Sequence, residues 1–546
     1  MAMYSITFLH LLNSPIQPVE LALQSGAEDN LCHLLFTSSQ RYCTPATATR
    51  WLYFLADPFN NLFHFILLKS KKTLASAVSF RYVSLRYLNK NTSKEVPCQE
   101  PANCPPSSLH VKTIDWHLRQ VALDKIARIS KFYRRTPQKI SALPFIAALC
   151  TAAYENIFSF SKIAFLLGIS GINVSKQAVA DRFNSYAVAF FKQTLNALID
   201  RVSGICAAKN QGVLAYFGKV YLQDSTHLSL PQHLADAYPG AKNQSGKKNA
   251  GMKIQAIFNL KNEQMADFGL FAFNRTDQTG SKDILELVQP KDLVIRDLGY
   301  FVLDVFKKLV EKGAFFLSRL KSKVAVYCPR TGKRLNLLGI LKNQSCSDID
   351  VLIGSDHKLP VRLVAMPVPD HIANQRRRKA KSNRDRRCKP SRQSLQLLGW
   401  QIFITNVDRS IWAPSTVCRL YAIRWRIEII FKAWKSHLAL ASIPEGSQNE
   451  LEIYIYSQLF NITIFHAFFD HLNRYMIDKH NKFLSMLKIA PLFGRILNAI
   501  YGLGGTITGG KLEDFLTNLL LRHCCYEKRN KRTNYAEHVE LLASLA

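Results

Sequence analysis

Three carboxylates lie in sequence contexts suited to binding divalent metal ions. We expect Asp224 to end the strand 213–224, Asp297 to end a strand that begins at residue 292, and Glu428 to lie on a helix. Hard cations such as Mg²⁺ prefer oxygen ligands, and ions that act on a phosphodiester are held by carboxylates from different elements. Taken singly, each acid also fits a turn, a strand exit or a solvated charge. Together they predict a metal-dependent site for phosphodiester chemistry.

The helix that carries Glu428 presents further polar residues on one face. Tyr421, Arg424, Glu428 and Lys435 are separated by two, three and six residues, which at about 100° per residue places them within an arc of about 60°. A simple surface pair between Arg424 and Glu428 is the alternative. Apolar residues on the other faces predict a buried helix, on which four aligned polar groups are costly unless they serve a site: Trp425, Ile427, Ile430, Phe431 and Trp434.

The segments around these residues predict a mixed α/β core. From residue 213 to 320, short β-branched and aromatic runs alternate with helical stretches in the order β-β-β-α-β-α-β. Further strand-like pieces follow up to residue 407, and a long helix is expected from about Ser415. The sequence before residue 210 is helical from about Asp115, and residues 161–183 have the outline of a helix-turn-helix with Ser175 as an N-cap. Two ordinary packed helices are the alternative for that outline.

The composition is that of a globular protein with a strong positive charge. Of 546 residues, 48% are apolar and 20% are charged, which excludes collagen-like, coiled-coil and wholly disordered proteins. The chain has 72 Lys and Arg against 39 Asp and Glu, a formal net charge of +33. Such a field attracts a polyanion. Nucleic acid is therefore the first partner to consider.

The same sequence disfavours membrane insertion and secretion. The most apolar stretches, 51–68 and 453–469, are interrupted by polar residues, so we expect them to be core segments. The first residues lack a positive region and a small-residue cleavage site, so we expect no signal peptide. The 12 cysteines form no CxxC pair and no zinc-ligand spacing, so reduced thiols are expected. These features predict a cytoplasmic protein.

A basic run lies between the strand-like pieces and the helix of Glu428. It holds ten Lys and Arg between Arg376 and Arg392, against one acid. The run begins with Arg376, Arg377, Arg378 and Lys379. Such a segment could neutralise several phosphates and make binding strongly dependent on salt. We expect a DNA-contacting loop, with a disordered basic patch as the alternative.

The sequence resembles a known family, the DDE transposases of bacterial cut-and-paste insertion sequences that carry the Y-(2)-R-(3)-E-(6)-K signature (the insertion sequence four family). The signature spacing matches completely, DSTHLSLP resembles the motif of the first Asp, and DLGYF that of the second. The resemblance covers roughly residues 115–480. It implies that Asp224, Asp297 and Glu428 bind two Mg²⁺ ions, with Mn²⁺ able to substitute. It also implies that Tyr421, Arg424 and Lys435 contact DNA phosphates near the cleaved end.

The resemblance carries further implications for the insertion and the assembly. Trp400 stands 21 residues before Tyr421, and in members that form hairpins a Trp at a similar place receives a flipped base. A core Trp is the alternative. The separation of 131 residues between Asp297 and Glu428 is similar to that of members with a β-strand insertion domain. The family implies a homodimer that pairs two ends of double-stranded DNA.

The expected fold class is α/β, with a ribonuclease-H-like catalytic core interrupted by a β-rich insertion domain and flanked by helical regions. The expected divisions are an unassigned N-terminal extension at 1–110, a helical DNA-binding domain at 111–210, the core at 211–321 and 411–445, the insertion at 322–410, and a helical C-terminal region at 446–546.

We expect this protein to be a nucleoid-associated transposase that cleaves DNA at insertion-sequence ends and transfers the strands into target DNA. Two alternatives remain. A catalytically silent, transposase-derived regulator would share the charge and the helix-turn-helix but would not need three acids. A divalent-metal nuclease without strand transfer would keep the acids but would not need Trp400 or the basic run.

Overall fold

A computed structural model describes residue 118 and residues 121–206, 212–241, 249–342, 344, 346–382, 389–497 and 509–526, of which 509–513 are described by backbone only. All of them lie in one compact unit, Thr92–Ala546. The extension expected at 1–110 lies outside the described residues, as does the first part of the helix expected from Asp115. The described part of that helix is α7, Leu123–Ile129.

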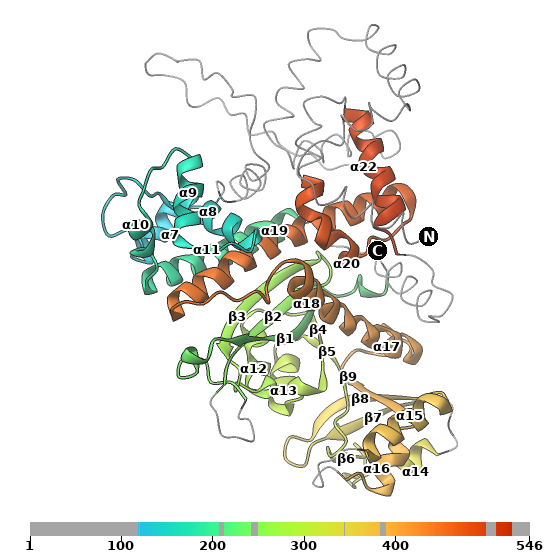
Figure 1. Ribbon diagram of the computed structural model, residues 1–546. Helices are drawn as coiled ribbons and strands as arrows, with labels where there is room; N and C mark the ends of the chain where they lie inside the picture. Colours follow the sequence, from blue (N-terminus) through green and yellow to red (C-terminus); the bar gives the residue numbers. More distant parts are fainter. Residues whose placement is uncertain are drawn as a thin grey trace. The chain divides into compact units, whose positions relative to one another are not determined.

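A nine-stranded sheet organises the described chain (Figure 1), so the protein has a mixed α/β fold. The strand order is β3-β2-β1-β4-β5-β9-β8-β7-β6. The strands are β1 Val220–Leu230, β2 Ala250–Asn259, β3 Gln264–Ala272, β4 Leu293–Arg296, β5 Phe315–Arg319, β6 Val326–Tyr327, β7 Ser347–Ile353, β8 Leu359–Pro367 and β9 Trp400–Thr405.

The first five strands form the half of the sheet that carries two of the acids. β1, β2 and β3 are antiparallel neighbours, whereas β4 and β5 run parallel to β1. Helices α12 (Asp277–Gly280) and α13 (Leu303–Glu311) connect the later strands. This matches the element order expected from the sequence. All four residues of β4 are buried, as a parallel strand covered on both faces requires.

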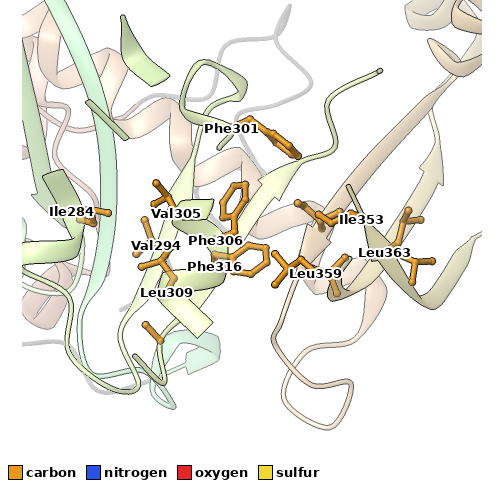
Figure 2. Close-up of a cluster of buried hydrophobic side chains, with 14 of the residues drawn as sticks. Ile284, Val294, Phe301, Val305, Phe306, Leu309, Phe316, Ile353, Leu359 and Leu363 are labelled. Carbon is orange, nitrogen blue, oxygen red and sulfur yellow. The ribbon is translucent and has the colours of Figure 1, made fainter. Parts of the chain in front are cut away.

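The second half of the sheet comes from the expected insertion. β9 pairs with both β5 and β8, so the strands of residues 326–405 continue the same sheet. Figure 2 shows the apolar cluster between the halves, in which Phe306 and Phe316 lie near Leu359. The helices of this segment are α14 (Leu337–Leu341), α15 (Asp370–Lys381) and α16 (Arg392–Leu397).

Helices make up the described parts before and after the sheet. The longest, α19 at Gln448–His480, begins at a capping box formed by Ser447 and Glu450 and packs on α8, α11 and β3. Residues 453–469 are buried throughout, which confirms that they are a core segment. None of the described helices is long and apolar enough to cross a membrane. The remaining helices are α8 Ala142–Tyr154, α9 Phe160–Ile169, α10 Lys176–Ala180, α11 Ser185–Ile205, α17 Pro414–Tyr421, α18 Trp425–His437, α20 Met486–Ile489 and α22 Gly509–His523.

The helix-turn-helix outline is present as α9 and α10, which contact each other. The Ser175 side chain accepts a hydrogen bond from the backbone N–H of Ala178, which confirms it as the N-cap of α10.

Three local predictions are wrong. The strand expected at 213–224 begins only at Val220, after a 3₁₀ turn at Gly212–Leu214, and Asp224 does not end it, because β1 continues to Leu230 through its pairing with β2. The helix expected from Ser415 is interrupted by a 3₁₀ turn at Ala422–Arg424, between α17 and α18. The basic run is not a loop over 376–381, where it is helical as part of α15. Strand β7 was not predicted; it alternates Asp and apolar residues and is held between β6 and β8.

Candidate active site

The three predicted carboxylates converge on one guanidinium. Arg424 Nη2 donates a hydrogen bond of 2.6 Å to Glu428 Oε1. Its Nη1 lies 3.7 Å from Asp224 Oδ2, and its Nε lies 3.6 Å from Asp297 Oδ1. The Arg424 side chain is only 11% exposed, so its guanidinium is largely shielded from solvent. Residues that are 73 and 131 positions apart in the sequence therefore form one acidic cluster around a cation.

The parallel pairing of β1 and β4 places the two aspartates side by side. Gln223 and Arg296 are partners in the register, and each directly precedes one aspartate. Arg296 is fully buried and donates hydrogen bonds to Gln223 Oε1 (2.8 Å), to Ser281 Oγ and to the Ser281 carbonyl. This buried network fixes the two strands directly behind the acids.

Glu428 is positioned by the packing of α18. Its apolar residues Ile427, Ile430 and Trp434 are buried, as predicted. Arg426, on the same helix, donates a 2.9 Å hydrogen bond to the buried carboxylate of Glu263. Trp425 departs from the prediction of a buried residue, since it is 58% exposed; it lies at the first position of α18, directly after the 3₁₀ turn.

The cluster is electrostatically poised for a cation. Burial raises the pKa of Asp224 to about 7, with the charges of Asp297 and Glu428 acting in the same direction, against the backbone N–H of Ser225 and the guanidinium of Arg424. Burial alone would lower the pKa of Arg424, but the Glu428 carboxylate and Asp297 raise it. Three carboxylates from a strand, a strand end and a helix are the hard oxygen donors that divalent ions prefer. The residues present therefore fit a divalent metal ion.

Two further predicted residues lie beside this cluster. Burial, followed by the charge of Asp297, raises the pKa of the Tyr421 phenol to about 12, and its ring packs against Phe403. Burial lowers the pKa of Lys435. Burial, with Lys435 as the next cause, also lowers the pKa of His227. The charge of Lys435 therefore acts on His227 of β1, which lies three residues beyond Asp224.

The structure adds a fourth carboxylate that the sequence did not indicate. Asp277 accepts hydrogen bonds of 3.0 Å from Ser225 Oγ and from Lys253 Nζ, and Ser225 directly follows Asp224. It also lies against Gly299 of the DLGYF motif, where an added Cβ would be 3.0 Å from Asp277 Oδ2. Asp277 thus joins the segments that carry Asp224 and Asp297. No motif marks it, because its role depends on contacts with β1 and β2.

Trp400 and the first cations of the basic run lie in the second half of the sheet. Trp400 begins β9, opposite Pro367, and packs partly buried against the apolar core. Arg377 donates a hydrogen bond to the Leu395 carbonyl and another to Asn374 Oδ1, whereas Arg378 and Lys379 are exposed. None of the contacts found among the described residues joins these five side chains, Arg376 included, to the three carboxylates.

Arg319, at the end of β5, acts electrostatically both on α15 and on Tyr421. Burial lowers the pKa of Arg376, and the charge of Arg319 lowers it further. Arg319 also acts to lower the pKa of Tyr421, although burial outweighs it there. Positive charge therefore extends from the cluster towards α15. Sequence analysis missed Arg319 because a single Arg at a strand end carries no motif.

Comparisons with known proteins match this chain to transposases. Residues 216–464 match the family model of the transposase DDE domain. The chain is 27% identical to a transposase for an insertion sequence element, IS231E, of Bacillus thuringiensis subsp. finitimus, over 78% of this chain and 92% of that protein. It is 24% identical to the transposase for insertion sequence element IS1151 of Clostridium perfringens, over 69% of this chain and 83% of that protein. The synaptic complex of piggyBac transposase with hairpin DNA gives a TM-score of 0.35 at 11% identity, over 79% of this chain and 87% of that one.

The domain match and these relatives support a DDE-type insertion-sequence transposase, an enzyme that cleaves and transfers DNA. The matched domain begins before β1 and ends within α19, so it spans all three carboxylates and the segment of residues 326–405. Transposases of this family generally use divalent metal ions, in agreement with the oxygen donors gathered here.

Proposed function

We propose that the first half of the sheet is a ribonuclease-H-like catalytic core. The support is its topology: the order β3-β2-β1-β4-β5, with β2 antiparallel to β1 and with β4 and β5 parallel to it. In this proposal the core comprises 211–321 and 411–445, the insertion 322–410, and the flanking helical domains 111–210 and 446–546.

We further propose that Asp224, Asp297 and Glu428 hold two Mg²⁺ ions, with Mn²⁺ able to substitute. The observation that carries this assignment is the convergence of all three carboxylates on Arg424 within 4 Å. Bound there, the metal would activate a nucleophile and stabilise the leaving oxygen of an in-line displacement. The protein supplies the donors from rigid elements, and the Gln223–Arg296 network keeps the two aspartates in place.

The basic groups beside the acids are assigned to DNA. When metal neutralises the carboxylates, the Arg424 guanidinium can turn its donors to a phosphate, for which its planar fork is suited. Tyr421 and Lys435 complete a polar face that holds the phosphodiester in the orientation needed for attack. Arg376, Arg377, Arg378 and Lys379 bind phosphates further from the cut.

The reaction proposed is cut-and-paste transposition. Water attacks the phosphodiester at the end of the element and leaves a 3′-hydroxyl. That hydroxyl attacks the opposite strand and displaces the 3′-hydroxyl of the flanking DNA, which closes a hairpin on the element end. A second water hydrolyses the hairpin and regenerates the 3′-hydroxyl, which then attacks a target phosphodiester and displaces a 3′-hydroxyl of the target strand. Trp400 would stack on a base flipped out at the hairpin. A homodimer would hold the two ends together.

The test is a cleavage and strand-transfer assay on end-labelled duplexes that carry the DNA flanking the gene, with Mg²⁺. We expect wild type to cut at discrete ends and join the products, and Asp297→Asn to do neither while still binding. Asp356→Asn, at an exposed site away from the cluster, is the matched control and should retain full activity.

Two results would support the alternative functions. Binding without any cut by wild type would indicate a silent regulator, and metal-dependent cutting without joining would indicate a nuclease.

A further inference from the structure

A hollow outside the active site has several cations among its lining residues. Its volume is about 800 Å³, and its walls are the segment between α7 and α8 together with residues of α10 and the start of α11. Five of the lining residues are cations, and Asp181 is the only acid among them. The cations are Lys131, Arg134, Arg135, Lys139 and Arg182. None of the elements that form the hollow carries a residue of the acidic cluster (Figure 1).

These cations are not neutralised within the part of the chain that the structure describes. No ion pair within 4 Å joins any of the five to an acid there, and Asp181 instead accepts a hydrogen bond from Gln177. Lys131, Arg134, Arg135 and Lys139 are exposed. Like charges gathered in one hollow repel each other, and an external polyanion relieves that repulsion.

Aromatic contacts hold two of the guanidiniums in place. Arg134 lies over the Tyr186 ring at 4.6 Å, and Arg182 lies over the Phe132 ring at 5.5 Å. Phe132 in turn stacks on Phe190 of α11 at 4.6 Å, with the rings nearly parallel. Stacked guanidiniums lose less freedom on binding a phosphate than mobile side chains do. The hollow is therefore preorganised.

We propose that this hollow binds the sugar-phosphate backbone of a DNA duplex, separately from the active site. The proposal rests on the proposed function, because it takes the transposon end as the duplex. The cations are exposed along a surface segment. They are therefore better placed to bind a DNA backbone that approaches from solvent than to enclose a small anion. Val174, Ala178 and Asp181 bring α10 to the edge of the hollow, so phosphates bound here set the duplex against the second helix of the helix-turn-helix. Phosphate contacts of this kind fix register and orientation.

The test measures binding of full-length protein to a labelled duplex of the element's own end, in EDTA so that no cleavage occurs. We expect Arg134→Ala/Arg135→Ala to weaken binding about tenfold or more, and to lower the slope of log affinity against log salt by about 2. The matched control is Lys307→Ala/Lys312→Ala, which removes two exposed cations, one in α13 and one at its C-cap, and should bind like wild type. If the arginine variant does not fold, a second pair of substitutions in the same hollow, Lys131→Ala/Lys139→Ala, replaces it.

A cleavage assay separates this site from the active site. With Mg²⁺, the arginine variant should need about tenfold more protein than wild type to reach half of its maximal cutting, whereas Lys307→Ala/Lys312→Ala should need the same amount as wild type. Equal affinities and equal salt slopes for wild type and the hollow variants would overturn the proposal while leaving the transposase function intact. Failure of wild type to bind or cut the end duplex would instead contradict the proposed function itself.

Discussion

The Arg296 guanidinium donates a 2.8 Å hydrogen bond to Gln223 Oε1, across paired strands and directly behind the two aspartates of the candidate site. Both residues are fully buried. Burial lowers the pKa of Arg296 to about 9, because the charged form of the side chain is removed from water. The positions of Asp224 and Asp297 therefore depend on a polar network that solvent does not reach.

Removal of that buried cation should destabilise the fold. In Arg296→Met, Gln223 and the Ser281 carbonyl lose their donor, and we expect a loss of about 2–4 kcal/mol in the free energy of unfolding. Urea denaturation measures it. Arg409→Met removes a partly exposed Arg that pairs with Asp348 and Asp350, and should cost less than about 1 kcal/mol. Equal costs for the two variants would contradict the role given to the network.

The raised pKa of Asp224 predicts a pH dependence of metal binding. A carboxyl whose folded pKa is about 7 is largely protonated at pH 6, so a metal ion must displace that proton. We expect Mn²⁺ affinity, measured by calorimetry, to rise between pH 6 and 8 and to release a proton on binding. A flat affinity over this range would show that Asp224 ionises normally.

The raised pKa of Asp224 also predicts how the stability of the metal-free protein depends on pH. Because the folded pKa is above the unfolded value, the native state binds the extra proton and loses stability as pH rises from about 4 to about 7. Asp224→Asn cannot ionise and should escape this loss. In EDTA, we expect the melting temperature of the variant to exceed that of wild type at pH 8, with a smaller difference at pH 5. An equal difference at both pH values would contradict this reading.

Arg424 should balance the carboxylate charge. In Arg424→Ala the three acids lose their shared cation, so the metal-free variant should melt lower than wild type at pH 8. Mg²⁺ should raise its melting temperature more than that of wild type, because the ion replaces the lost charge. Cleavage should still fall by about 10²–10³, since the phosphate loses a preorganised donor. Arg419→Ala, on the preceding helix, is the control; an equal Mg²⁺ response in both variants would oppose this account.

Asp277 should position the first aspartate rather than react. Asp277→Asn keeps an acceptor for Ser225 but removes the charge that holds Lys253, so we expect cleavage to fall about tenfold, within the range of supporting residues around metal sites. Higher Mg²⁺ should partly restore the rate, which a purely structural defect would not allow. Asp304→Asn, which removes a carboxylate from an exposed surface pair, serves as the control. An unchanged Mg²⁺ requirement in Asp277→Asn would refute the positioning role of Asp277.

Local patterns in the sequence determined the elements and the candidate acids. Short β-branched and aromatic runs identified the strands around residues 252–273 and 293–319, because the preference of these residue types for strands can be recognised locally. The spacing of Tyr421, Arg424 and Glu428 along the chain identified them, together with Lys435, as a group of polar residues that could serve one site. Charge counting indicated a nucleic-acid partner, since net charge does not depend on folding.

The tertiary structure alone decided which groups meet. β1 extends beyond Asp224 because β2 pairs with it residue by residue, and Arg424 reaches both aspartates because a 3₁₀ turn precedes α18. Asp277 and the basic hollow combine residues whose short-range patterns are unremarkable. Strand pairing and helix packing are long-range choices, made by the whole core burying its apolar surface, and they set distances that no local pattern contains.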